Sequence, residues 1–290
     1  MTSDSPIICG DAEATLRTLP AKSVALTVTS PPYFRHRDYN VAGQLGQEST
    51  LSEYLTRLGR VLSELLRVTD DAGCCFLVIG DSYTNRRLQL VPHRLAILAT
   101  DLGWTVRNDI IWRKASPPPE SVKNRWRNGH EHVLFMTKRP SGYRFNTDVI
   151  RIPHSAETIR RWGAGQSYGG SKSQQRRHPD DSRMRDGQVF QLNPKGCLPT
   201  DVWQLAAANL SSLHFAAFPA ELAHLAIKAC SDSGDLILDP FVGSGTTCVA
   251  ALQNNRRCLG IELNPEFAAM ARAAVSANSS TVVGHVLAGP

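Results

Sequence analysis

The sequence contains neither a long apolar run nor a regular cysteine framework. No apolar stretch approaches the roughly 18 residues that a membrane span requires, and residues 1–11 lack the basic and apolar regions of a signal peptide. The seven cysteines are odd in number and include no C-x-x-C pair, which argues against a disulfide scaffold and a zinc knuckle. We therefore expect a soluble, cytoplasmic protein with reduced thiols and no membrane partner.

Positive charge is concentrated in one part of the chain. The 290 residues carry a formal net charge of +6, and residues 113–200 alone contain 17 Lys and Arg against 7 Asp and Glu. The remainder has 15 basic and 19 acidic residues. A basic stretch on a neutral to acidic body is typical of a protein that binds a polyanion, because Lys and Arg release counterions from phosphates. The alternative is a basic loop that is simply solvated.

Short β-rich runs alternate with helical patterns before residue 113 and after residue 200, which predicts an α/β sheet with crossover helices. The predicted strands are Pro6–Cys9, Val24–Thr29, Cys75–Ile79, Val106–Trp112, His132–Thr137, Leu236–Asp239 and Arg257–Glu262. The predicted helices are Leu51–Leu65, Pro92–Leu102, Pro219–Ser231, Cys248–Gln253 and Pro265–Val275.

Two segments fit neither pattern. Residues 151–200 are rich in Gly, Ser, Gln and Arg and show no sustained period, so they are expected to form a loop-rich insertion between the two halves 1–150 and 201–275. Residues 276–290 have no charged side chain and several small residues, which predicts a flexible tail.

A glycine-rich turn follows the predicted strand that ends at Asp239. It is not a phosphate-binding P-loop, because no Lys follows Gly243 and Gly245, and Cys248 stands where a dinucleotide fingerprint has its third glycine. The next strand ends in Glu262, 19 positions after Gly243, where a carboxylate can accept two hydrogen bonds from ribose hydroxyls. The pattern favours a nucleoside ligand over a polyphosphate. The alternative is a tight turn without a ligand, with Glu262 as a charge near a helix N-terminus.

A second unusual turn, Thr29-Ser30-Pro31-Pro32-Tyr33, ends the β-branched strand that begins at Val24. Neither proline has an N–H to donate, so the turn is stiff and leaves carbonyls free to accept hydrogen bonds. The Ser30 hydroxyl and a main-chain carbonyl beside the Tyr33 ring would suit a planar amino group. Taken alone, the turn is better explained as a simple strand end.

Together the two turns resemble the S-adenosylmethionine-dependent amino-group DNA methyltransferases. Asp239–Thr247 is similar to their cofactor motif and Thr29–Tyr33 to their catalytic motif, in the order of the permuted β group. Further matches, over about residues 6–275, are Gly10–Ala12 on the adenine side, Asn108–Trp112 with His130-Glu131 in the centre, and His214–Pro219 at the methionine end of the cofactor. The resemblance implies a Rossmann-like methyltransferase sheet with crossover helices, circularly permuted motif order and a target-recognition insertion at 151–200.

The resemblance also implies site residues. The catalytic residues it implies are Ser30, Pro31, Pro32 and Tyr33. Those for S-adenosylmethionine are Asp11, Phe218, Pro219, Asp239, Pro240, Phe241, Gly243, Ser244, Gly245, Thr246 and Glu262. The candidates for DNA contact are Arg160, Arg161, Arg176 and Arg177. No metal is required.

The implied reaction is transfer of a methyl group to the exocyclic N4 of cytosine in double-stranded DNA, by direct attack of a flipped base. The family's SPPY form is associated with N4 of cytosine, whereas DPPY or NPPY is usual for N6 of adenine. Three alternatives stay open: an adenine-N6 enzyme, a catalytically silent DNA-binding protein, and an RNA substrate. Compatible further partners are a cognate restriction endonuclease and a second copy of the chain.

Overall fold

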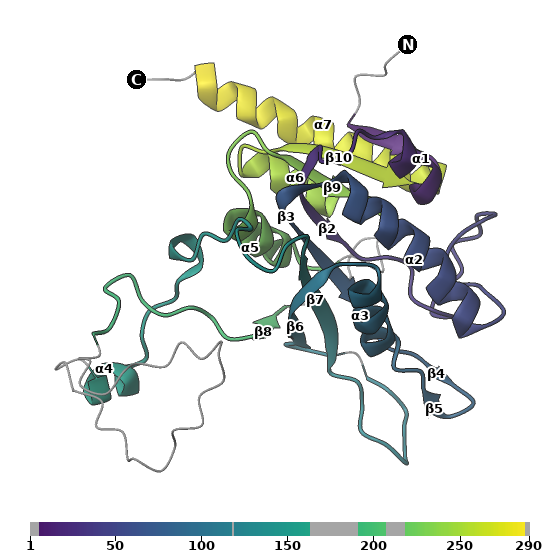
Figure 1. Ribbon diagram of the computed structural model, residues 1–290, viewed down its shortest axis with the longest axis horizontal. Coiled ribbons are helices and arrows are strands. Elements are labelled where there is room, and N and C mark those ends of the chain that lie inside the picture. The colour runs from purple at the N-terminus through teal and green to yellow at the C-terminus, as the bar shows by residue number, and fades with distance from the viewer. Residues whose placement is uncertain (1–5, 118, 163–190, 207–217, 288–290) are drawn as a thin grey trace. The chain divides into compact units, whose positions relative to one another are not determined.

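One mixed sheet forms the centre of the fold (Figure 1). In the computed structural model, which describes residues 6–117, 119–162, 191–206 and 218–287, eight strands lie in the order β1-β10-β9-β2-β3-β7-β6-β8. The strands from β1 to β3 along this order are parallel, β7 is antiparallel to both of its neighbours, and β8 is parallel to β6. The strands are β1 Ile7–Cys9, β2 Val24–Thr29, β3 Thr69–Ile79, β6 Thr105–Lys114, β7 His130–Thr137, β8 Val202–Leu205, β9 Leu236–Asp239 and β10 Arg257–Glu262.

The predicted strands are confirmed, and three of them match residue for residue. Val24–Thr29, Leu236–Asp239 and Arg257–Glu262 have the predicted bounds, whereas β3, β6 and β7 extend beyond them. Every residue of β2 is buried, as expected for a central parallel strand with helices on both faces. β8 was not predicted; it is a short edge strand with two of its four residues exposed.

Helices cover both faces of this sheet (Figure 1). α1, α2 and α3 pack together on one face, and α5, α6 and α7 pack together on the other. Their bounds are α1 Ala12–Thr18, α2 Leu51–Val68, α3 Val91–Asp101, α5 Ala220–Cys230, α6 Thr246–Gln253 and α7 Pro265–Leu287. None of the helices in the described ranges is both long and apolar enough to cross a membrane.

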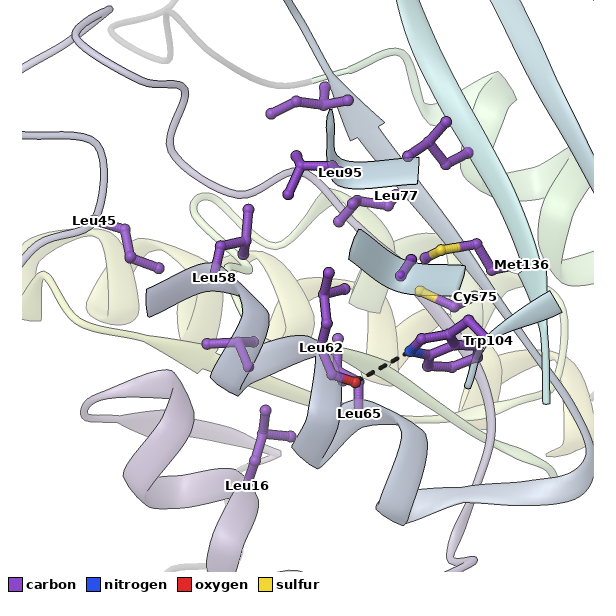
Figure 2. Packing of buried hydrophobic residues seen from close by; sticks show 14 of the residues in the cluster. Leu16, Leu45, Leu58, Leu62, Leu65, Cys75, Leu77, Leu95, Trp104 and Met136 are labelled. Atoms are coloured by element: carbon purple, nitrogen blue, oxygen red, sulfur yellow. Dashed lines mark hydrogen bonds between the residues drawn. The ribbon is translucent and has the colours of Figure 1, made fainter. Parts of the chain in front are cut away.

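A large group of buried side chains lies between α2 and the sheet (Figure 2). Leu58, Leu62 and Leu65 are buried on one side of α2 and pack with Leu77 of β3. Each such side chain stabilises the fold by roughly 1.5 to 3 kcal/mol through the removal of apolar surface from water. Trp104 is buried in the same group, and its Nε1 donates to the carbonyl of Leu62 at 3.1 Å, so its polar atom is satisfied.

α7 differs from the prediction at its end. It begins at Pro265 as predicted but continues to Leu287 instead of stopping near Val275, so the expected flexible tail at 276–290 is helical over residues 276–287. The absence of charged side chains in this segment was a poor helix-stop signal, because Ala, Ser and Val can all continue a helix once it has begun.

The chain divides into two units, Met1–Asn146 with Asp201–Pro290, and Thr147–Thr200. The insertion predicted at 151–200 falls inside the smaller unit. Its described part contains a 3-10 turn at Asp148–Ile150, a short helix α4 at Ala156–Trp162, and a bridge between Ile152 and Cys197. The helix was not predicted. Target recognition by this unit stays a prediction.

Candidate active site

The two turns singled out in the sequence follow the carboxyl ends of two neighbouring strands. β2 and β9 are parallel neighbours, with Leu26 opposite Ile237 and Thr27 opposite Leu238. The S-P-P-Y turn follows β2 and the glycine turn follows β9, so both leave the sheet at the carboxyl ends of their strands. Ligands of open α/β sheets bind outside the carboxyl ends of the strands.

A buried carboxylate joins the two turns. Asp239 Oδ1 accepts from the hydroxyl of Thr29 at 2.6 Å and from Phe241 N at 3.0 Å, while Oδ2 accepts from the hydroxyl of Thr247 at 2.7 Å. Burial raises the pKa of Asp239 to about 6, although these hydrogen bonds oppose the shift. Asp239 therefore connects the last residue of β2 to the start of α6.

A cavity of about 410 Å³ opens beside these turns, within the 300 to 1,000 Å³ typical of small-molecule sites. Its lining includes most of the residues that were predicted to bind S-adenosylmethionine. These are Asp11, Phe218, Asp239, Pro240, Phe241, Gly243, Ser244, Thr246 and Glu262, joined by Ser30 and Pro32 of the other turn. Pro31, Tyr33, Pro219 and Gly245 do not line it. The segment 207–217, which holds most of the predicted methionine-end motif, lies outside the described residues.

Two glycines shape the turn for different reasons. Gly243 has φ +52°, and a side chain there would meet no atom within 4 Å. Gly245 has φ +98°, and a Cβ would lie 3.2 Å from the Cα of Ala271 in α7. Gly243 thus keeps the cavity open and Gly245 allows the turn to approach a helix.

Glu262 holds the glycine turn from the neighbouring strand. Its Oε2 accepts from Gly243 N at 2.9 Å, and its Oε1 accepts from Asn264 N at 2.9 Å. Burial raises the pKa of this carboxyl group, against the effect of the backbone hydrogen bonds. A carboxylate has about four acceptor sites, so each oxygen retains capacity toward the cavity.

Asp11 has a structural role that the sequence did not indicate. Its Oδ1 accepts from Ala14 N at 2.8 Å and caps the N-terminus of α1. The sequence also missed Tyr39 and Phe267, whose rings line the cavity with centroids 6.1 Å apart. Neither lies in a recognisable motif.

A chain of hydrogen bonds fixes the S-P-P-Y turn. The Ser30 hydroxyl donates to the Tyr33 hydroxyl oxygen at 3.3 Å, and Tyr33 donates to Glu131 Oε2 at 2.5 Å. Lys114 Nζ lies 2.6 Å from Glu131 Oε1. Burial and the charge of Glu131 raise the pKa of Tyr33, so its hydroxyl stays protonated and continues to donate.

The rest of the turn is held by α2 and β3. The buried Tyr54 donates to the carbonyl of Pro32 at 2.9 Å. A Cβ at Gly80 would stand 2.7 Å from Cε2 of Tyr33, so only glycine leaves room for that ring after β3. The Tyr54 hydroxyl thus uses one of the two acceptor sites of the Pro32 carbonyl, and Gly80 leaves space for the Tyr33 ring.

The predicted DNA-contact residues have different outcomes. Arg160 and Arg161 lie in α4 of the smaller unit, and both form ion pairs with Glu157. Arg176 and Arg177 lie outside the described residues. No group of His, Cys, Asp and Glu in the described part of the chain could hold a metal ion.

Comparison with known proteins agrees with this geometry. A family model described as DNA methylase, for N6 and N4 methyltransferases, matches residues 24–273. The type II methyltransferase M.XycI of Xanthomonas campestris pv. cyanopsidis is 32% identical over 308 residues, covering 96% of this chain and 90% of the relative. M.Cfr9I of Citrobacter freundii is 33% identical over 287 residues, covering 89% and 83%.

Two solved structures are also similar. TTHA0409 of Thermus thermophilus, complexed with S-adenosyl-L-methionine, is 27% identical with a TM-score of 0.62, over 94% of this chain and 93% of that one. PvuII DNA methyltransferase, described as cytosine-N4-specific, shares the fold at 18% identity with a TM-score of 0.66, over 97% and 95%. On the family match and the two bacterial relatives, the chain belongs to the DNA methylase family of N6 and N4 amino-group methyltransferases.

Proposed function

We propose that this protein transfers a methyl group from S-adenosylmethionine to the exocyclic N4 of cytosine in double-stranded DNA. The observation that carries the proposal is a chain of hydrogen bonds in which Ser30, which lines a cavity of nucleoside size, donates to Tyr33 and Tyr33 donates to Glu131. Because the Glu131 carboxylate can only accept, the Tyr33 hydroxyl donates to it, and the Ser30 hydroxyl in turn donates to the Tyr33 oxygen. The Ser30 oxygen then presents lone pairs, which an amino group can use.

The cavity fits the methyl donor. S-adenosylmethionine, when bound, supplies a methyl group activated by a positively charged sulfur. Glu262 is proposed to accept from the ribose hydroxyls through its remaining lone pairs, while the open space beside Gly243 admits the ligand to the main chain. Tyr39, Phe241 and Phe267 provide apolar surface for an adenine ring.

An exocyclic amine is a poor nucleophile because its lone pair is conjugated into the base. Ser30 and the Pro31 carbonyl are proposed to accept its two hydrogens, which favours a pyramidal nitrogen and stabilises the positive charge that develops on it. Because the Pro32 carbonyl already accepts from Tyr54, the Pro31 carbonyl is the one proposed for this role. The Tyr33 ring is proposed to stack on the flipped base.

The choice of cytosine rests on Ser30, since the SPPY form of the motif is associated with N4 in the family. Adenine N6 is the second candidate, because both bases present an amine beside a ring nitrogen. Contact of Arg160, Arg161, Arg176 and Arg177 with DNA is also proposed. A restriction endonuclease partner and a homodimer stay predictions.

Replacing Glu262 with Ala should weaken binding of S-adenosylmethionine by about 2 to 3 kcal/mol, because hydrogen bonds to a carboxylate are lost. Isothermal titration calorimetry measures the change. Glu266→Ala, at an exposed position in the first turn of α7, is the matched control and should bind like the wild type. Unchanged affinity in Glu262→Ala would remove this residue from the cofactor site.

Ser30→Ala should lower turnover about tenfold, while cofactor affinity stays near the wild-type value, because the lost acceptor acts mainly as the nitrogen becomes pyramidal. Ser23→Ala, just before the other end of β2, is the control and should retain full activity. Digestion of methylated DNA followed by mass spectrometry should yield N4-methylcytosine. N6-methyladenine would establish the second candidate instead, and 5-methylcytosine would contradict the mechanism.

A further inference from the structure

Trp126 is the most conspicuous side chain that the proposed active site leaves unused. It lies in the loop between β6 and β7 and is 93% exposed, more than any other large apolar side chain among the described residues. Aromatic side chains contribute most of their energy by burial, and Trp126 gains almost none of it within its own chain.

This loop is held in place by a second, smaller one. β4 at Tyr83–Thr84 and β5 at Arg87–Leu88 form a hairpin, and the Arg125 guanidinium lies 4.0 Å from the ring centroid of Tyr83. Arg125 also pairs with Glu120 and donates to the carbonyl of Trp126 at 3.0 Å. The backbone at Trp126 is therefore anchored before any partner binds, which reduces the entropy lost on binding.

The two loops carry an excess of positive charge. Arg86 and Arg87 are exposed on the hairpin, and Lys123 and Arg127 are exposed on either side of Trp126. Glu120 is the single carboxylate within residues 82–88 and 119–129, and it is already paired with Arg125. Two linked loops that carry four exposed cations and one exposed aromatic ring are complementary to a nucleic acid.

The base of the larger loop is next to the catalytic turn. Lys114 N donates to the carbonyl of Gly129 at 2.9 Å and closes the loop. The same Lys114 contacts Glu131 through its side chain, and Glu131 accepts from Tyr33. The base of this loop therefore lies beside the turn at which the target base is proposed to sit.

We propose that residues 83–88 and 119–129, here called the Trp126 surface, contact duplex DNA beside the target base. Lys123, Arg127 and the hairpin arginines contact phosphates, and the Trp126 ring stacks on base faces that are exposed when the target nucleotide leaves the helix. The inference rests on the proposed function, since flipping of the target base is what exposes such faces in an intact duplex. It assigns DNA contact to the larger unit, in addition to the predicted insertion.

The charge contribution can be measured with a fluorescein-labelled duplex of about 30 base pairs of mixed sequence. Binding anisotropy between about 50 and 200 mM salt gives the slope of log affinity against log salt. In the double variant Lys123→Ala/Arg127→Ala the slope should become shallower by about 0.9 for each phosphate that is no longer neutralised, or nearly two in all. Lys22→Ala/Arg139→Ala is the matched control, because both residues pair with Asp71 near the start of β3, whereas the catalytic turn follows the end of β2. Equal slopes in the two double variants would overturn the proposal.

The stacking contribution is tested with the same duplex carrying one abasic site, which exposes neighbouring base faces. Trp126→Ala should weaken binding to the abasic duplex about tenfold or more, with a smaller effect on the intact duplex. Trp126→Phe should retain most of the affinity, and the exposed position means that neither change disturbs the core. An equal loss on both duplexes, or no loss on either, would overturn the stacking role.

The wild type separates this inference from the proposed function. If it binds and methylates DNA while the variants match it, only the Trp126 surface fails. If it binds no duplex DNA, or binds a matching RNA duplex more tightly, the surface and the proposed function fail together.

Discussion

Replacing Asp239 with Ala is expected to lower the free energy of unfolding by about 3 to 5 kcal/mol. The Thr29 hydroxyl and Phe241 N would lose their buried acceptor, and a cavity would form where the carboxyl group stood. The Thr247 hydroxyl would keep a hydrogen-bond partner, because it can donate to the carbonyl of Val28 at 3.1 Å. Urea denaturation measures the effect, and a loss below about 1 kcal/mol would contradict the importance of this network.

Asp239→Asn should preserve the network and change how stability depends on pH. The amide oxygen can accept from Thr29 and Phe241, while the amide nitrogen donates to Thr247. The native pKa of about 6 lies above the unfolded value of about 3.9. The protonated form is thus favoured by folding, so its stabilising effect is present below about pH 4 and is lost as pH rises through 6.

The pH effect amounts to about 3 kcal/mol over this interval. The stability of Asp239→Asn should therefore rise relative to the wild type between pH 4 and 6, because its amide does not ionise. Denaturation curves of both proteins at matched pH values measure the difference. Parallel profiles would show that Asp239 does not titrate in this range.

Replacing Glu131 with Ala is expected to slow methylation on the order of 10²-fold or more, while binding of S-adenosylmethionine stays intact. Glu131 is a positioning residue: it fixes the hydroxyl of Tyr33, and through it the direction of the Ser30 hydrogen. Without it the ring can turn, and Lys114 is left unpaired near an amine that becomes positive. Single-turnover rates with radiolabelled methyl donor measure the loss.

Two further variants separate these contributions. Tyr33→Phe keeps the stacking ring and removes only its hydroxyl, so it should be less damaging than Glu131→Ala. Adding Lys114→Met to Glu131→Ala should restore part of the rate if the unpaired ammonium repels the developing charge. A merely structural role would instead lower stability and cofactor affinity together, and equal rates in Glu131→Ala and the wild type would contradict the assignment.

Local patterns predicted the elements that carry the site. β2 is a run of apolar and β-branched residues, β9 begins with three apolar residues, and both end in distinctive turns, so their bounds could be placed from residues a few positions apart. The resemblance then paired the two turns, and the cavity between them contains most of the residues it implied. The predicted end of α7 near Val275 was wrong, because no residue there forces a helix to stop.

The contacts that position the catalytic turn could not be predicted in this way. Tyr33 and Glu131 are 98 residues apart, and Tyr54 and Pro32 meet only because α2 returns along the sheet. His130-Glu131 was recognised as part of a family motif, but a motif does not show which atom its carboxylate faces. Tyr39 gave no signal beyond its residue type, and Trp126 was indicated only by its place in the basic stretch 113–200.

The pairing of β2 with β9 also sets the order in which the molecule can be completed. The hydrogen bond from Thr29 to Asp239 spans 210 residues of sequence. During synthesis β2 and the S-P-P-Y turn leave the ribosome early. The side of β2 that pairs with β9 has no partner until the last quarter of the protein is synthesised. The catalytic turn thus acquires its support after most of the chain is made, and such long-range closure makes folding slow compared with locally connected folds.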